Sequence, residues 1–185
     1  MRWWSQTMIL KRRGGWIMHN VNVQKLLQTA QEFREDPDKA KRPASLQGVW
    51  NVQEGEPQFT AVVKFEGGES VLEMDQPTFL GGGGTRPGPI QYCLYGFAAC
   101  FAGTLASVAA EQGVTLKRLE VTVETTLDFS RVFGLSENPI AEGITIVPLI
   151  EADADPSTIQ RVKELAAQRC PAVYCLTNPI RVSVT

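Results

Sequence analysis

The sequence predicts a single α+β domain with the element order βββ-α-ββ-α-β. The first observation behind this order is a run without any charged side chain between Arg86 and Glu111, which is long enough for a helix of about six turns. The second is a set of three short strand-like runs before it, and the third is a pair of strand-like runs and an amphipathic helix after it. A chain of 185 residues is long enough to bury a core of its own.

The composition is that of an ordinary globular protein and excludes several classes. Hydrophobic residues make up 43% and charged residues 21%, and the net charge of −2 gives no basic surface for nucleic acid. The four cysteines are too few and too irregularly spaced for a secreted disulfide framework, which predicts reduced thiols in the cytoplasm. The Gly-rich stretch from Gln76 to Pro89 fits neither a phosphate loop nor a dinucleotide fingerprint, so we expect a tight connection and no cofactor.

The chain divides into an N-terminal part, residues 1–44, with a leader, a helix and a linker, and a main domain at residues 45–185. Residues 1–19 mix bulky apolar and basic side chains but lack the continuous apolar run of a secretory signal, so we expect no export. Met8 and Met18 are alternative starts, and the unusual composition fits either an over-extended reading frame or a tether.

A helix, a linker and three strands follow the leader. Apolar residues keep a helical period from Val21 to Glu35, with Asn20 or Asn22 as the cap, and Asp36–Ala44 is a polar linker. Turn-forming glycines separate the next runs, which predicts a three-stranded antiparallel meander. Its strands are expected at Leu46–Val52, Gln58–Phe65 and Ser70–Met74.

The uncharged stretch from Pro89 to Gln112 predicts a helix that must be enclosed on all sides. A membrane span is the alternative, but the Ala- and Gly-rich content and the lack of basic residues after its end favour a buried core helix and no membrane partner. One chain supplies too little second layer to cover this helix, so we expect an obligate homodimer whose central helices meet along small residues. These small residues are Gly96, Ala99, Gly103 and Ala106.

The remaining chain predicts two strands, a helix and a last strand. Asp155 and Pro156 provide a cap and a first helical residue for an amphipathic helix. Cys170 and Pro171 either close that helix or open a new helical turn with Cys170 as its cap. The strands are expected at Leu116–Phe129, Ile144–Ile150 and Ile180–Val184.

Cysteine is the residue type left for chemistry. The single histidine, His19, lies in the leader, which excludes Ser-His-Asp and Cys-His catalysis and histidine metal sites. The spacings Cys93 to Cys100 and Cys170 to Cys175 lack the short knuckles of structural zinc, so we expect no metal. Cys93 and Cys100 lie about two turns apart on one helix face, which is too far for a bond between them. A disulfide partner for Cys100 must come from elsewhere, although most buried cysteines are simply small core residues.

Two cysteine motifs stand out in the second half of the sequence. The first is Gly-x-Ala-Ala-Cys-Phe at Gly96–Phe101, inside an apolar helix that is entered from a Gly-rich loop containing proline. The second is Arg-Cys-Pro at Arg169–Pro171, followed by Asn178–Val182 entering the last expected strand. Together these motifs resemble those of the OsmC/Ohr proteins, and the resemblance covers approximately Leu46–Thr185.

The resemblance implies an intertwined homodimer, with antiparallel sheets wrapped around two central helices, and a thiol peroxidase that reduces organic hydroperoxides. Cys100 would be the peroxidatic thiol and Cys170 the resolving thiol, and an external dithiol would reduce the Cys100–Cys170 disulfide. Such a disulfide requires Cα atoms within about 7 Å of each other.

One position departs from the family's pattern. Ile90 stands where a glutamate of the family helps to hold a catalytic arginine over the thiolate. No arginine occurs between Arg42 and Arg86, and Lys64 is the only cation of the expected N-terminal strands, so no catalytic arginine is assigned. Cys100 lies in the middle of a helix, where the helix dipole gives no help, and its thiolate needs a nearby cation.

Three functions are compatible with these features. The first is an OsmC-type peroxidase acting on hydrophobic peroxides, slower or differently tuned than an Ohr-type enzyme. The second is a binding or sensing protein whose apolar pocket near Cys100 holds a small hydrophobic or sulfur-containing ligand. The third is a structural dimer whose cysteines are core residues.

Overall fold

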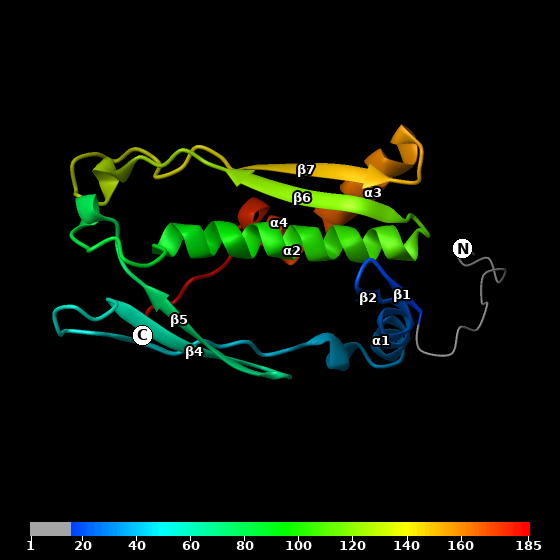
Figure 1. Ribbon diagram of the computed structural model, residues 1–185, viewed down its shortest axis with the longest axis horizontal. Coiled ribbons are helices and arrows are strands. Elements are labelled where there is room, and N and C mark those ends of the chain that lie inside the picture. The colour runs from blue at the N-terminus through cyan, green and yellow to red at the C-terminus, as the bar shows by residue number, and fades with distance from the viewer. Residues whose placement is uncertain (1–15) are drawn as a thin grey trace.

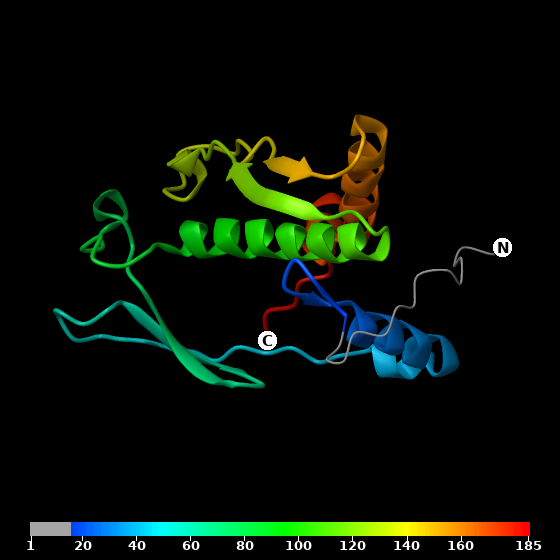
Figure 2. The same cartoon turned by 45° about the vertical axis from the view of Figure 1, so that its right-hand side comes forward.

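The computed structural model describes residues 16–185 and is an α+β fold arranged around helix α2 (Pro89–Glu111). Strands β6 (Leu116–Glu124) and β7 (Thr145–Ala152) pair antiparallel and lie along one side of α2. The N-terminal three-stranded sheet lies on the opposite side of α2 (Figure 1), and the view in Figure 2 has the same order of layers. Our prediction of a single long apolar helix at the centre of the fold is confirmed.

The N-terminal segment forms a small hairpin and a helix. Strands β1 (Ile17–Met18) and β2 (Val21–Asn22) pair antiparallel, and the two residues between them, His19 and Asn20, both have positive φ. Helix α1 (Val23–Glu35) follows, and the Asn22 side chain accepts a hydrogen bond from the backbone N–H of Lys25. The helix therefore begins at Val23, two residues later than the apolar pattern predicts, because Val21 and Asn22 pair in the hairpin. A short 3-10 turn, η1 (Pro37–Ala40), interrupts the expected linker.

The predicted three-stranded meander is present. Strands β3 (Gly48–Trp50), β4 (Phe59–Phe65) and β5 (Gly68–Met74) pair antiparallel in this order. Next comes the Gly-rich connection, which Asp75 organises. Its buried carboxylate accepts hydrogen bonds from the backbone N–H groups of Gly83 and Thr85. The connection is therefore an ordered turn, as expected from its composition.

One side of α2 supplies the core and the other side is open. Leu105 and Val108 are at most 1% exposed and pack with residues of the strands and of helix α3 (Pro156–Arg169). On the other side, no atom beyond the adjoining residues and the nearby backbone of α2 lies within 4 Å of a Cβ added at Gly96 or Gly103. By length and composition α2 could cross a membrane, a test that core helices also pass, and only 28% of its most apolar 18-residue window is buried by the chain.

Two strand predictions require correction. Strand β6 ends at Glu124 instead of Phe129, because the chain then turns into a 3-10 helix, η3 (Phe129–Arg131), whose Ser130 N–H donates to the Asp128 side chain. The expected last strand at Ile180–Val184 is absent from the described residues. A strand needs a neighbouring edge for its backbone hydrogen bonds, and this segment pairs with no described strand.

After α3 the chain continues into a second, short helix, α4 (Pro171–Thr177), which precedes this exposed tail. Of the two alternatives left open for Cys170 and Pro171, the new helical turn is the one observed. Cys170 is at once the C-cap of α3 and the N-cap of α4.

Candidate functional site

The two thiols singled out in the sequence meet in the structure. The Sγ atoms of Cys100, in α2, and Cys170, between α3 and α4, are 3.7 Å apart although the residues are 70 positions apart. Both are free thiols, and the Cys170 thiol donates to the Cys100 sulfur. Cys170 is 0% exposed, whereas Cys100 is partly exposed.

Backbone hydrogen bonds on both sides fix the position of Cys170. Its N–H donates to the carbonyl of Ala166 in the last turn of α3, at 2.9 Å, and its carbonyl accepts from the N–H of Tyr174 in α4, also at 2.9 Å. Ala166 and Val162 are buried in the same cluster as Cys170 and hold α3 against α2. The junction between the two helices therefore presents the Cys170 sulfur to α2.

The immediate surroundings of Cys100 make its thiol a weaker acid than usual. Burial raises the pKa of the Cys100 thiol above its ordinary value, and the thiols of Cys170 and Cys175 act in the same direction. The backbone N–H of Ala172, at the start of α4, hydrogen-bonds to the Cys100 sulfur and lowers the pKa, but it does not outweigh burial. The geometry of a redox pair is present, whereas strong thiolate activation is not.

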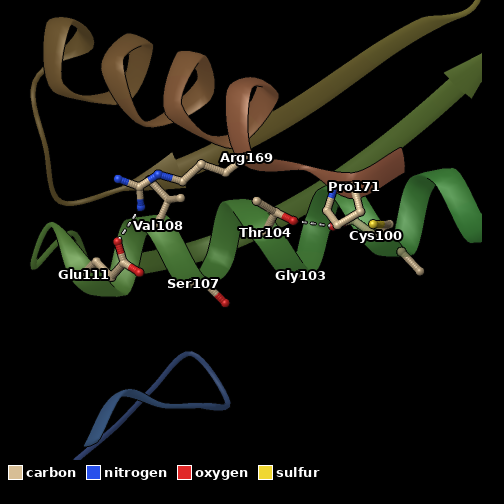
Figure 3. Close-up of a pocket in the computed structure, with 9 residues that line it drawn as sticks. Cys100, Gly103, Thr104, Ser107, Val108, Glu111, Arg169 and Pro171 are labelled. Carbon is tan, nitrogen blue, oxygen red and sulfur yellow. Dashed lines mark hydrogen bonds and ion pairs between the residues drawn. The ribbon is translucent and has the colours of Figure 1, made fainter. Parts of the chain in front are cut away.

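A shallow cleft of about 380 Å³ runs along α2 from Cys100 toward the C-terminal end of the helix (Figure 3). Small residues of α2 form most of its floor, and the start of α4 forms one rim. The lining residues are Ala99, Cys100, Gly103, Thr104, Ser107, Val108, Glu111, Arg169 and Pro171.

An ion pair at the far end of this cleft was not anticipated from the sequence. The Arg169 guanidinium lies 2.7 Å from the Glu111 carboxylate, and Figure 3 shows the arginine extending along the cleft toward Glu111 and away from Cys100. In the sequence, Arg169 directly precedes Cys170, and this was the one sign that Arg169 could lie near the site. Its partner is 58 residues away, so only the packing of α3 on α2 reveals the pair.

The two other cations named in the sequence analysis, Arg86 and Lys64, lie outside the cleft that contains Cys100. Arg86 precedes α2, and its Nε is 2.6 Å from the Glu73 carboxylate of β5. Lys64 is exposed in β4, and Ile90 occupies the second position of α2 with 36% exposure. Neither Arg86 nor Lys64 lines the cleft that contains Cys100.

His19 has a structural contact within the described chain. Its Nδ1 accepts a hydrogen bond from the backbone N–H of Leu116, at 3.2 Å, which joins the β1–β2 hairpin to the start of β6. Burial lowers the pKa of His19, so its neutral form, which can accept this bond, is favoured. Within residues 16–185, no group of three or more His, Cys, Asp or Glu side chains is arranged to hold a metal ion.

A larger apolar hollow of about 910 Å³ lies between the N-terminal sheet and the start of α2. Several of its aromatic and aliphatic side chains are exposed, including Trp50 at 52% and Tyr95 at 73%. The hollow is lined by Leu46, Trp50, Phe59, Ala61, Leu72, Met74, Pro87, Pro89, Gln91, Tyr92 and Tyr95.

Comparison with known proteins identifies the family and the fold of the chain. The family model described as OsmC-like protein matches residues 81–185. The organic hydroperoxide resistance protein of Xanthomonas axonopodis pv. citri is 30% identical over 115 residues, which cover 61% of this chain and 76% of that protein. The crystal structure of the OsmC like protein from Mycoplasma pneumoniae covers 74% of this chain and 88% of its own, with a TM-score of 0.54 and 19% identity. An organic hydroperoxide resistance protein from Elizabethkingia anophelis covers 74% and 91%, with a TM-score of 0.51 and 20% identity, and shares the fold. Since the family model spans more than half of the sequence, the chain belongs to the family of OsmC-like proteins.

Proposed function

We propose that the protein is a thiol peroxidase that reduces organic hydroperoxides, with Cys100 as the attacking thiol and Cys170 as the resolving thiol. The observation that carries this proposal is the 3.7 Å separation of the two sulfur atoms. A disulfide bond is about 2.05 Å long, so a small movement of the side chains would close it. The similarity to the hydroperoxide resistance proteins of Xanthomonas supports a peroxidase role at the level of the family.

The reaction needs only these two thiols, the peroxide and an external dithiol. The Cys100 thiolate attacks one peroxide oxygen, the O–O bond breaks, and the alkoxide leaves as an alcohol after it takes up a proton. Cys100 is then a sulfenic acid. The Cys170 thiolate attacks its sulfur, water leaves, and the Cys100–Cys170 disulfide forms. An external dithiol reduces this disulfide and is itself oxidised.

The raised pKa of Cys100 makes this a slow peroxidase within a single chain. Peroxide reacts with the thiolate, and the burial of Cys100 disfavours its thiolate at neutral pH. The Arg169 guanidinium shares the cleft but is bound by Glu111, so it does not neutralise the thiolate in this arrangement.

The shape of the cleft supports an organic rather than a charged peroxide. Ala99, Gly103 and Val108 offer apolar contacts, and the polar residues Thr104 and Ser107 of the lining are uncharged. The Thr104 hydroxyl donates to the carbonyl of Cys100. The charged side chains of the lining are paired with each other at the far end. An alkyl or aryl hydroperoxide therefore suits the part of the cleft next to the sulfur.

We further propose that the protein acts as a homodimer in the cytoplasm, where thiols stay reduced. The exposed small-residue stripe at Gly96, Ala99 and Gly103 offers a surface on which a second α2 could pack closely. The exposed apolar side chains of the hollow beside the N-terminal sheet, such as Trp50 and Tyr95, would also be covered in such an assembly. Sedimentation at micromolar concentration checks this, and a folded monomer would contradict it.

The test of the enzymatic proposal is turnover of cumene hydroperoxide with dithiothreitol as the reductant. Replacing the attacking thiol in Cys100→Ser should abolish consumption of the peroxide. The exposed thiol of Cys93, two turns away on the same helix, provides the matched control, and Cys93→Ser should retain the wild-type rate. Equal turnover in Cys100→Ser and the wild type would refute the proposal.

The weak activation of Cys100 favours one alternative, a protein that binds or senses a small hydrophobic or sulfur-containing ligand. Burial raises the pKa of Cys100 and so disfavours its thiolate, and a neutral thiol beside an apolar lining suits binding better than rapid attack. Calorimetric titration of small organic thiols and sulfides would detect such binding. Turnover that depends on both Cys100 and Cys170 would argue against this alternative.

A further inference from the structure

The cleft that contains Cys100 also holds one pair of opposite charges. Of the side chains that line it, those of Arg169 and Glu111 are charged, and they lie 2.7 Å apart at its far end. Cys100 is in the middle of α2, where the helix dipole gives no help, so a thiolate there needs a cation close by. Arg169 is the residue of the lining that can supply this charge.

The neighbour of Arg169 in the chain brings its backbone close to Cys100. Arg169 directly precedes Cys170, so their Cα atoms are about 3.8 Å apart. The Cys170 sulfur is in turn 3.7 Å from the Cys100 sulfur. Figure 3 shows the stem of Arg169 starting between Glu111 and Cys100, with the guanidinium turned toward Glu111. This long side chain can therefore be directed to either end of the cleft by a change of rotamer.

The ion pair that holds Arg169 away from Cys100 is a weak one. The Arg169 side chain is 48% exposed and that of Glu111 is 20% exposed. The contact joins one guanidinium nitrogen, Nη1, to one carboxylate oxygen, whereas the strong arrangement of these groups uses two parallel hydrogen bonds. Partly exposed pairs contribute little to stability, so Arg169 can exchange Glu111 for another anion at small cost.

We propose that Arg169 is the cation that stabilises the thiolate of Cys100, and that Glu111 is a positioning residue that withholds this cation in the resting protein. The ion pair between them then sets how reactive Cys100 is. This inference rests on the proposed function only in that Cys100 is the attacking thiol. It gives the cleft a source of positive charge that comes from the residue next to the resolving thiol.

The same position of Arg169 also suits the attack on a peroxide. As the sulfur bonds to one oxygen and the O–O bond breaks, negative charge moves from the sulfur to the leaving alkoxide. A guanidinium beside Cys100 faces this charge before and after the transfer. Arg169 forms no covalent bond and takes no electrons, so the balance of the reaction is unchanged.

The experiment measures the rate at which iodoacetamide alkylates Cys100 between pH 6 and 10, followed by peptide mass. In Glu111→Gln the amide no longer holds the guanidinium by charge. An opposite charge within about 6 Å lowers the pKa of a thiol enough to give about tenfold more thiolate, and the lower nucleophilicity of that thiolate reduces the gain to about threefold. We therefore expect Glu111→Gln to label Cys100 about threefold faster than the wild type at pH 7, and to reach its plateau at a lower pH. The thiols of Cys170 and Cys175, which also shift the pKa of Cys100, are the same in every variant.

Two double variants separate the action of Arg169 from the loss of a carboxylate, which by itself also favours a nearby thiolate. Glu111→Gln/Arg169→Gln should label close to the wild-type rate, because both charges are gone. Glu111→Gln/Arg169→Lys keeps the positive charge and should retain most of the increase.

Glu73→Gln is the matched control for the freed arginine. It releases Arg86 from a similar ion pair, at 2.6 Å, but Arg86 does not line the cleft. Cys100 in this variant should label at the wild-type rate. The fully buried Cys170 reports on the fold in the same peptide maps, since rapid labelling there would mark an opened chain. Glu111→Asp, whose shorter side chain withdraws the carboxylate, gives the same test with an intermediate increase if the amide variant does not fold.

Labelling of Cys100 in folded Glu111→Gln or Glu111→Asp at the wild-type rate would overturn the proposal. An undiminished increase in Glu111→Gln/Arg169→Gln would do so as well, because Arg169 would then have no part in it. The assay contains no peroxide, so it stands apart from the test of the peroxidase. Loss of the proposed function would leave these labelling rates unaffected, and unchanged rates would leave the peroxidase proposal intact.

Discussion

Raising the pH from 6 to 10 should increase the rate at which Cys100 is alkylated. The pH at which this rate levels off reports how the surroundings of Cys100 shift its pKa. Burial and the neighbouring thiols raise the pKa of Cys100, and the single hydrogen bond from the Ala172 N–H only partly offsets them. An ordinary cysteine has a pKa of about 8.5, so at pH 7 about 3% of it is thiolate. Because the pKa of Cys100 is raised, the share of its plateau rate that is reached at pH 7 should be smaller than the share that an unburied thiol reaches.

The assay is pseudo-first-order labelling with iodoacetamide, resolved by peptide so that Cys100 is followed separately from the exposed Cys93 and Cys175. Cys170 is fully buried and should label last. Glutathione measured alongside gives the behaviour of an unburied thiol. The rate at Cys100 should keep rising above pH 8.5, because deprotonation is not complete there. A plateau reached by pH 7 would refute the reasoning and would mean that a cation stabilises the thiolate.

Three further predictions concern stability. Leu105→Ala should lower the free energy of unfolding by about 2–5 kcal/mol in urea titrations, since Leu105 is fully buried on the side of α2 that faces the core. A loss below about 1 kcal/mol would contradict that packing. The partly exposed pair of Arg169 and Glu111 should show a coupling of only about 0.2–1 kcal/mol in a double-mutant cycle. A coupling of several kcal/mol would contradict its exposure. Hydrogen bonds from Ser157 and Thr158 lower the pKa of Asp155, so its contribution is present above about pH 4 and is lost as the pH falls. The difference in melting temperature between the wild type and Asp155→Asn should therefore shrink toward pH 3, and a constant difference would contradict this cause.

The elements with a strong local pattern were predictable from the sequence. The extent of α2 follows from its uncharged run and its initial Pro89, and the start of α3 follows from the Asp155 cap. The alternation in β6 also appears in its burial pattern. The nearness of Cys100 and Cys170 was expected from the family resemblance, because no local signal joins residues 70 positions apart.

The features that were missed depend on tertiary neighbours. The β1–β2 hairpin has strands of only two residues, too short for any period, and it is held by the contact of His19 with Leu116. The segment Ile180–Val184 alternates like a strand but has no partner within the described chain, so its pattern alone could not decide its conformation. The pairing of Arg169 with Glu111 required the packing of α3 on α2.

The most direct test of the central claim is peptide mapping of the protein after one equivalent of cumene hydroperoxide. The account predicts the loss of two hydrogen atoms from the wild type and a disulfide that links Cys100 to Cys170. In Cys170→Ser, dimedone present during oxidation should trap the sulfenic acid on Cys100. A wild-type protein whose Cys100 and Cys170 both remain free thiols after the peroxide is consumed would contradict the account.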